Sequence, residues 1–167
     1  SLEDVIDRTV EQGKVPFILI LDGVTDVRNF GAIVRSAECA GVHAVVMPAK
    51  GAAPINADAM KTSAGALNYV PVCRVSNIRT ALYYLKDKDF KVIAATEKAE
   101  NTYFSKSYSG PVAIILGSED TGISKPSLEL ADELVKITIS GKIQSLNVSA
   151  AAAIIMFEAV KQRMTNL

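Results

Sequence analysis

Short apolar runs alternate along the chain with longer segments of helical periodicity. Most of the apolar runs are rich in β-branched residues and lack the apolar–polar alternation of a half-exposed strand. Such runs are typical of buried strands in a parallel sheet, so the pattern predicts an α/β fold. The predicted strands are Phe17–Leu21, Ala44–Met47, Tyr69–Val72, Lys91–Ala95, Val112–Leu116 and Leu134–Ile139.

The segments between the predicted strands indicate helices. Gly41 is placed to end the first of them, and Ser76 or Asn77 to cap the third. We find no repeat, low-complexity tract or linker, which predicts a single domain over residues 1–167. The predicted helices are Arg28–Ala40, Asp58–Ala64, Ile78–Leu85, a short helix after Pro126, and Val148–Met164.

Composition adds limits on partners and location. The 18 basic and 18 acidic residues give zero net charge, so binding to a polyanion would need a local basic patch. Cys39 and Cys73 stand far apart and have no partner at a metal-ligand spacing, which argues against a zinc site or a disulfide framework. The acidic N-terminus and the lack of a long apolar run predict neither a signal peptide nor a membrane span. We therefore expect a cytoplasmic protein.

Unusual residues gather in three segments that follow predicted strands, where ligands of open parallel sheets bind. The first runs from Asp22 to Arg35 and places this arginine among small and apolar neighbours. Its guanidinium needs an anion or a carbonyl as partner, although a surface ion pair would satisfy it equally. Asn29 in the same segment could be an ordinary helix cap.

The other two segments are glycine- and serine-containing turns. Leu116–Ser124 has two glycines that permit tight turns, and Glu119 offers a carboxylate. This segment matches neither a Walker loop nor the GxGxxG pattern, and alone it could be a simple turn. Ile137–Ser149 leads into a helix that Ser145 or Asn147 could cap.

Taken together and in this order, the three segments resemble the signature motifs of the SpoU (TrmH) family of RNA 2′-O-methyltransferases, in the SPOUT superfamily. The motifs are Asn29–Arg35, Leu116–Gly122 and Ser145–Ser149, and no motif position departs from the pattern. The resemblance extends from about Val15 to about Arg163. It implies an α/β knot, which is a mostly parallel sheet with helices on both faces and a C-terminal trefoil knot. It also implies a homodimer whose active site spans the subunit interface.

The resemblance further implies roles for individual residues. Arg35 would be the catalytic arginine, either as a base or as an electrostatic stabiliser of the reacting oxygen. A polar set would orient this arginine and the ribose, namely Asn29, Glu119, Ser145 and Asn147. S-adenosylmethionine would be the cofactor, with no metal. The residues expected to bind it are Thr96, Leu116, Gly117, Ile137, Ile139, Ser145 and Leu146.

Several substrates remain open within this family. Because the chain stops soon after Arg163, it lacks the C-terminal extension of the tRNA-modifying members, which favours a guanosine of 23S ribosomal RNA. The start at Ser1 suggests that an N-terminal RNA-binding domain is missing. The alternatives are a tRNA 2′-O-methyltransferase and a non-catalytic RNA-binding or assembly protein. The intact motifs argue against the last of these.

Overall fold

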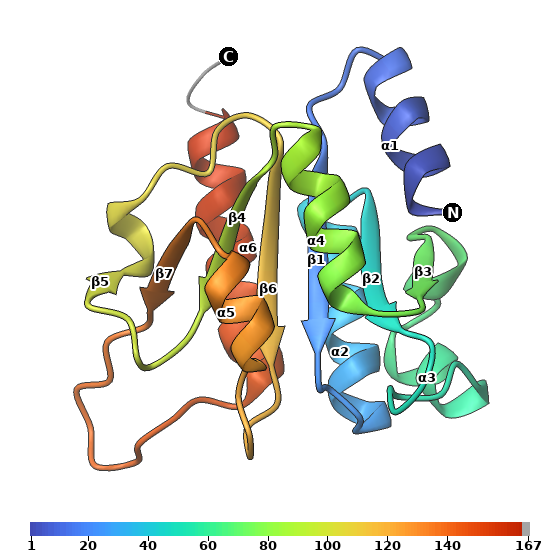
Figure 1. Ribbon diagram of the computed structural model, residues 1–167. Coiled ribbons are helices and arrows are strands. Elements are labelled where there is room, and N and C mark those ends of the chain that lie inside the picture. The colour runs from blue at the N-terminus through green and yellow to red at the C-terminus, as the bar shows by residue number, and fades with distance from the viewer. Residues whose placement is uncertain (165–167) are drawn as a thin grey trace.

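The computed structural model describes residues 1–164, which form one sheet flanked by helices (Figure 1). The sheet has the strand order β3-β2-β1-β6-β4-β7-β5, and all of its neighbouring strands pair in parallel. This confirms the predicted α/β class. The strands are β1 (Phe17–Asp22), β2 (Ala44–Pro48), β3 (Val72–Val75), β4 (Lys91–Ala95), β5 (Asn101–Thr102), β6 (Val112–Gly117) and β7 (Glu133–Lys136).

Helices cover both faces of the sheet because the central strands are buried on both sides. In β1, Phe17, Leu19 and Leu21 point into one apolar core, while Ile18 and Ile20 point into the other. The first core contains α2 (Val27–Ala40), α3 (Ala57–Thr62) and α6 (Val148–Met164). The second contains α1 (Leu2–Glu11), α4 (Ile78–Asp87) and α5 (Lys125–Leu130), which lie in front of the sheet in Figure 1.

Two predicted strands have different bounds in the structure. The prediction Tyr69–Val72 is wrong except for its last residue, because Tyr69 closes a 3₁₀ turn (Ala66–Asn68) and is 76% exposed. The prediction Leu134–Ile139 extends too far. β7 ends at Lys136 because its neighbours β4 and β5 end beside it, which leaves the following residues without a strand partner.

One α-helix and one strand were not predicted. The helix α1 buries Leu2, Val5, Ile6 and Thr9, whose spacing is helical, and the side chain of Ser1 accepts a hydrogen bond from its first turn. The strand β5 has only two residues, which is too short to give an apolar run in the sequence. The other predicted helices are confirmed, with α6 at its predicted bounds. Of the two predicted caps of α4, Asn77 is the one used, because its Oδ1 accepts a hydrogen bond from the amide of Thr80 at 2.9 Å.

The protein's single histidine lies beside the start of β1, and folding lowers its pKa. The Nδ1 atom of His43 accepts a hydrogen bond from the amide of Phe17 at 3.0 Å. Partial burial lowers the pKa of His43, and the positive charges of Arg163 and Lys14 lower it further. The folded state therefore favours the neutral imidazole.

We expect this histidine to make the protein less stable in mild acid. The contribution of neutral His43 to the free energy of unfolding is fully present above its unfolded-state pKa of about 6.5. It is lost as pH falls through the lower pKa of the folded state. His43→Asn keeps an acceptor atom but removes the titration. Unfolding free energies of the two proteins between pH 8 and 5 should diverge below about pH 6.5, by at most about 1.4 kcal/mol per pH unit. Parallel curves would contradict this assignment.

Within residues 1–164, none of the helices is both long and apolar enough to cross a bilayer. Cys39 and Cys73 both carry free thiols.

Candidate active site

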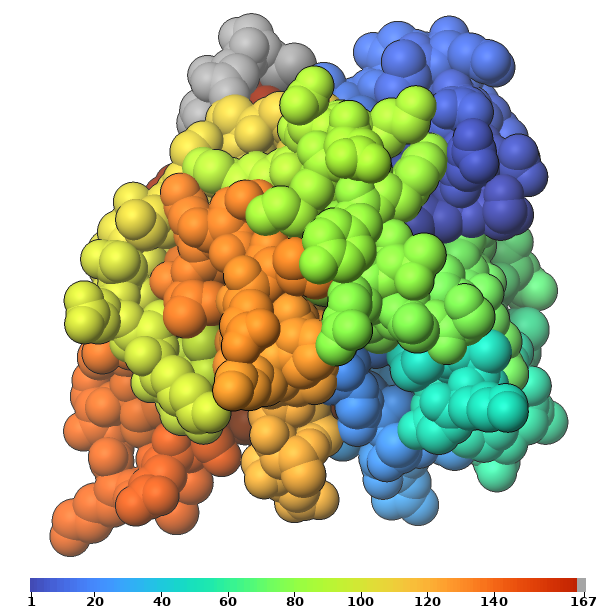
Figure 2. All heavy atoms as spheres, in the orientation of Figure 1, coloured from blue at the N-terminus to red at the C-terminus, as the bar shows by residue number. Residues whose placement is uncertain are grey.

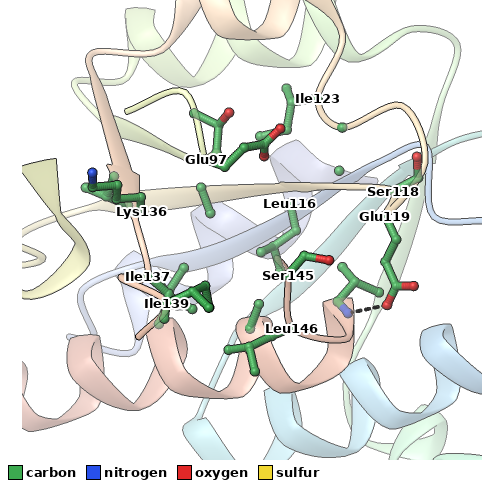
Figure 3. A pocket seen from close by; sticks show the side chains of 18 of the residues that line it. Glu97, Leu116, Ser118, Glu119, Ile123, Lys136, Ile137, Ile139, Ser145 and Leu146 are labelled. Carbon is green, nitrogen blue, oxygen red and sulfur yellow. Dashed lines mark hydrogen bonds between the residues drawn. The ribbon is translucent and has the colours of Figure 1, made fainter. Parts of the chain in front are cut away.

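A cavity opens at the carboxyl ends of the neighbouring strands β4, β6 and β7 (Figure 3). In an open parallel sheet this edge is where loops from different strands meet and where ligands bind. Its walls come from the ends of these strands, from loop 118–124, from segment 137–147, and from the start of α6. The lining includes all seven residues expected to bind the cofactor: Thr96, Leu116, Gly117, Ile137, Ile139, Ser145 and Leu146.

Loop 118–124 turns back sharply over the end of β6. A Cβ atom added at Gly117 would lie 2.3 Å from the carbonyl carbon of Gly122 and 2.4 Å from the amide nitrogen of Ile123. Gly122 itself has φ +68°, a conformation that glycine adopts readily. The amide of Gly122 donates to the carbonyl of Ser118 at 2.9 Å, which closes the turn. Only a glycine at position 117 allows the loop to approach this closely.

Segment 137–147 forms the opposite wall without regular structure. It projects from the body of the molecule beside loop 118–124 (Figure 2). Ile139 and Leu146 leave 37% and 39% of their surface exposed, yet both line the cavity. Apolar side chains that face an open cavity suit a flat apolar group of a ligand.

The three motif segments meet at the N-terminus of α6. Glu119 Oε1 accepts a hydrogen bond from the amide of Val148 at 2.8 Å (Figure 3), and Asn147 Oδ1 accepts one from the amide of Ser149 at 2.9 Å. Asn147 therefore caps this helix, in preference to Ser145. Its Nδ2 also donates to Asn29 Oδ1 at 3.0 Å, which ties α6 to α2.

Asn29 is not the cap of α2. That position belongs to Asp26, whose Oδ1 accepts a hydrogen bond from the amide of Asn29 at 2.9 Å. The side chain of Asn29 is thus available for the contact with Asn147. Asn29 and Glu119 line a smaller hollow that adjoins the main cavity and shares Ser118, Glu119 and Val148 with it.

Arg35 lies apart from both hollows. It is exposed on α2, six residues and about 9 Å along the helix from Asn29. No residue of the described range 1–164 forms a hydrogen bond or an ion pair with it. The anion or carbonyl expected to partner its guanidinium is therefore not supplied by the part of the chain that the structure describes.

Several lining residues were not anticipated from the sequence, among them Glu97, Ile123 and Lys136 (Figure 3). Glu97 follows the buried run of β4, so its position was a usable signal, whereas Lys136 lay inside the predicted strand Leu134–Ile139. Among residues 1–164, no cluster of three or more His, Cys, Asp or Glu side chains could hold a metal ion.

Comparison with known proteins gives the family of this chain. Residues 16–157 match the model of the SpoU rRNA Methylase family. The chain is 40% identical over 161 residues to the 23S rRNA (guanosine-2'-O-)-methyltransferase RlmB of Photorhabdus laumondii, covering 96% of this chain and 66% of that protein. It is 42% identical over 148 residues to RlmB of Escherichia coli K12, covering 89% and 61%. The chain thus spans just under two thirds of the length of these relatives.

Solved structures share the fold. The SpoU methyltransferase AviRb from Streptomyces viridochromogenes in complex with AdoMet has a TM-score of 0.84 at 26% identity, covering 91% of this chain and 62% of that one. The TrmH/SpoU tRNA modifying enzyme of A. aeolicus has a TM-score of 0.82 at 30% identity, covering 99% and 85%. The structure is that of a parallel α/β protein with a cavity at the carboxyl edge of its sheet. The chain belongs to the SpoU methylase family.

Proposed function

We propose that this domain transfers a methyl group from S-adenosylmethionine to a ribose 2′-hydroxyl of RNA, at a guanosine of 23S ribosomal RNA. One observation carries the proposal: seven residues from three distant segments, expected to bind this cofactor, line a single cavity. The names of the RlmB relatives support the reaction and the substrate. The AdoMet complex of AviRb supports the cofactor.

The cavity fits the chemistry of this cofactor. Its apolar residues, such as Leu116, Ile139 and Leu146, suit the adenine ring. Ser145 and Glu97 offer polar groups for the ribose hydroxyls and the methionine ammonium. When bound, S-adenosylmethionine supplies an already activated methyl group, so the protein's main contribution is position.

The acceptor hydroxyl needs more help than the donor. Negative charge develops on the ribose oxygen as it attacks, and a fixed guanidinium stabilises such charge. Because an arginine stays protonated at neutral pH, we assign Arg35 to electrostatic stabilisation and not to proton removal. The placement of Arg35 depends on the junction of α2 and α6. Hydrogen bonds of Asn29, Asn147 and Glu119 hold this junction.

A homodimer reconciles this role with the position of Arg35. Within one chain Arg35 is exposed and lies outside the cavity. The adjacent helix α6 exposes Ile154 and Phe157, by 36% and 45% of their surface, although it packs against α2. We propose that a second copy covers this surface and that Arg35 of one subunit completes the site of the other.

Three further expectations remain part of this proposal. The whole protein would carry an additional RNA-binding domain, as the greater length of the relatives suggests. The backbone would form the trefoil knot that the family resemblance implies. The location would be cytoplasmic, which the free thiols of Cys39 and Cys73 support.

Transfer of radiolabel from S-adenosylmethionine to total RNA, followed by nucleoside mapping, tests the function. The expected product is 2′-O-methylguanosine in 23S RNA. Label in tRNA would instead favour the second candidate, which the similarity to the A. aeolicus tRNA modifying enzyme supports. Binding of RNA without any transfer, also in a longer chain with the additional domain, would favour a non-catalytic role.

A further inference from the structure

Loop 118–124 forms one wall of the cavity, and two attachments fix it to the sheet. The first is the close approach of Gly117 and Gly122 described above. The second is at the far end of the loop, where Ser124 donates two hydrogen bonds to Asp22 Oδ2. The amide of Ser124 lies 3.0 Å from this oxygen, and its hydroxyl lies 2.6 Å from it. The hydroxyl distance is typical of a charge-assisted hydrogen bond.

The hydroxyl of Ser124 does not cap the helix that follows it. Ser124 is the N-cap residue of α5, and a serine there normally accepts a hydrogen bond from an amide in the first helical turn. No such capping bond is present. The hydroxyl instead donates to Asp22 and also lies 3.1 Å from the hydroxyl of Ser127 in the first turn of α5, so the side chain of Ser124 attaches the loop to β1.

Asp22 is placed to serve as the fixed end of this attachment. It is the last residue of β1 and pairs in register with Gly117 of β6, so its carboxylate stands at the same sheet edge as the cavity. Asp22 does not itself line the cavity, whereas Gly122 and Ile123, next to Ser124, do. Any effect of Asp22 on a ligand must therefore pass through the loop.

We propose that Asp22 is a positioning residue for the cofactor site. By holding Ser124, its carboxylate fixes Gly122 and Ile123 against the end of β6 and keeps the cavity wall in its binding geometry. This inference rests on the proposed function, because it takes S-adenosylmethionine as the ligand.

The test is calorimetric titration of S-adenosylmethionine into wild type, Asp22→Asn and Ser124→Ala. Each substitution weakens the attachment without changing a lining residue, and the Kd should rise about five- to tenfold. Combining the two should raise the Kd little beyond Asp22→Asn alone, since the hydroxyl of Ser124 acts through the same carboxylate. Amide hydrogen exchange at Gly122 and Ile123 should become faster in each variant.

Asp132→Asn is the matched control. The Asp132 carboxylate accepts hydrogen bonds from the amide of Val92 at 2.7 Å and from Lys86 Nζ at 3.0 Å, near the start of β4 and outside the cavity. This variant should lose thermal stability but keep the wild-type Kd. If Asp22→Asn is equally destabilised yet binds within twofold of wild type, the positioning role is overturned. If the wild type itself does not bind, the proposed function falls, and this inference falls with it.

Discussion

Arg35→Ala is expected to slow methyl transfer to RNA by about 100- to 10,000-fold, or about 3 to 5 kcal/mol in the activation barrier. The physical reason is the loss of the one cation assigned to the charge that develops on the ribose oxygen. Because Arg35 lies outside the cavity of its own chain, the Kd for S-adenosylmethionine should stay unchanged. Single-turnover transfer to RNA, together with calorimetric titration of the cofactor, measures both quantities.

A matched variant separates this role from a general loss of positive charge. Arg79 is also exposed but lies on α4, on the opposite face of the sheet. Arg79→Ala should therefore transfer methyl groups at nearly the wild-type rate. Mixed dimers of Arg35→Ala with a cofactor-binding variant should regain part of the activity if the site spans two subunits. Normal transfer by Arg35→Ala would remove the arginine from the mechanism.

Gly117→Ala is expected to weaken cofactor binding strongly and to destabilise the fold. The added methyl group would stand 2.3 Å from the backbone of Gly122, and a backbone atom cannot move aside as the end of a flexible side chain can. Overpacking of this kind costs about 1 to 3 kcal/mol, and more where the backbone must shift. Thermal unfolding should show the loss of stability, and titration should show a Kd raised beyond about 100-fold.

The same substitution at another glycine provides the comparison. A Cβ atom at Gly141 meets no atom within 4 Å, and this glycine does not have positive φ. Gly141→Ala lies in the segment that forms the other wall, so it tests whether any added methyl group near the cavity is harmful. It should leave the unfolding temperature and the Kd close to wild type. Equal damage from both substitutions would contradict the steric explanation.

The sequence located structural elements correctly where the pattern covered several consecutive residues. The apolar runs at Phe17, Lys91 and Val112 located buried strands, because continuous apolar character over five residues is incompatible with an exposed face. The family resemblance selected seven residues for cofactor binding that the structure then placed around one cavity, whereas Arg35 lies outside it. A predicted strand had the wrong bounds where the adjacent strands determine its length. β7 ends at Lys136 because no strand continues beside it.

Long-range contacts were beyond the reach of such patterns. No local sequence pattern around Asp22 or Ser124 predicts the hydrogen bonds between them, because 102 positions separate the two residues in sequence. A serine before a helix predicts a cap, and here the tertiary structure uses the same hydroxyl to hold a loop. From the sequence, Glu119 is likewise expected to offer a free carboxylate. In the fold, this carboxylate accepts a hydrogen bond from the first amide of α6.

The sequence by itself therefore determined the α/β class and the positions of most elements. These follow from side-chain character repeated over a few neighbouring positions, which fixes local backbone preference and burial. The family resemblance of its motifs, and not periodicity, supplied the seven predicted cofactor-site residues that line the cavity. The tertiary structure alone decided that β6 lies between β1 and β4, that three motif segments meet at the start of α6, and that Arg35 lies outside the cavity. Those outcomes depend on which distant segments pack together, and that is set by the whole core.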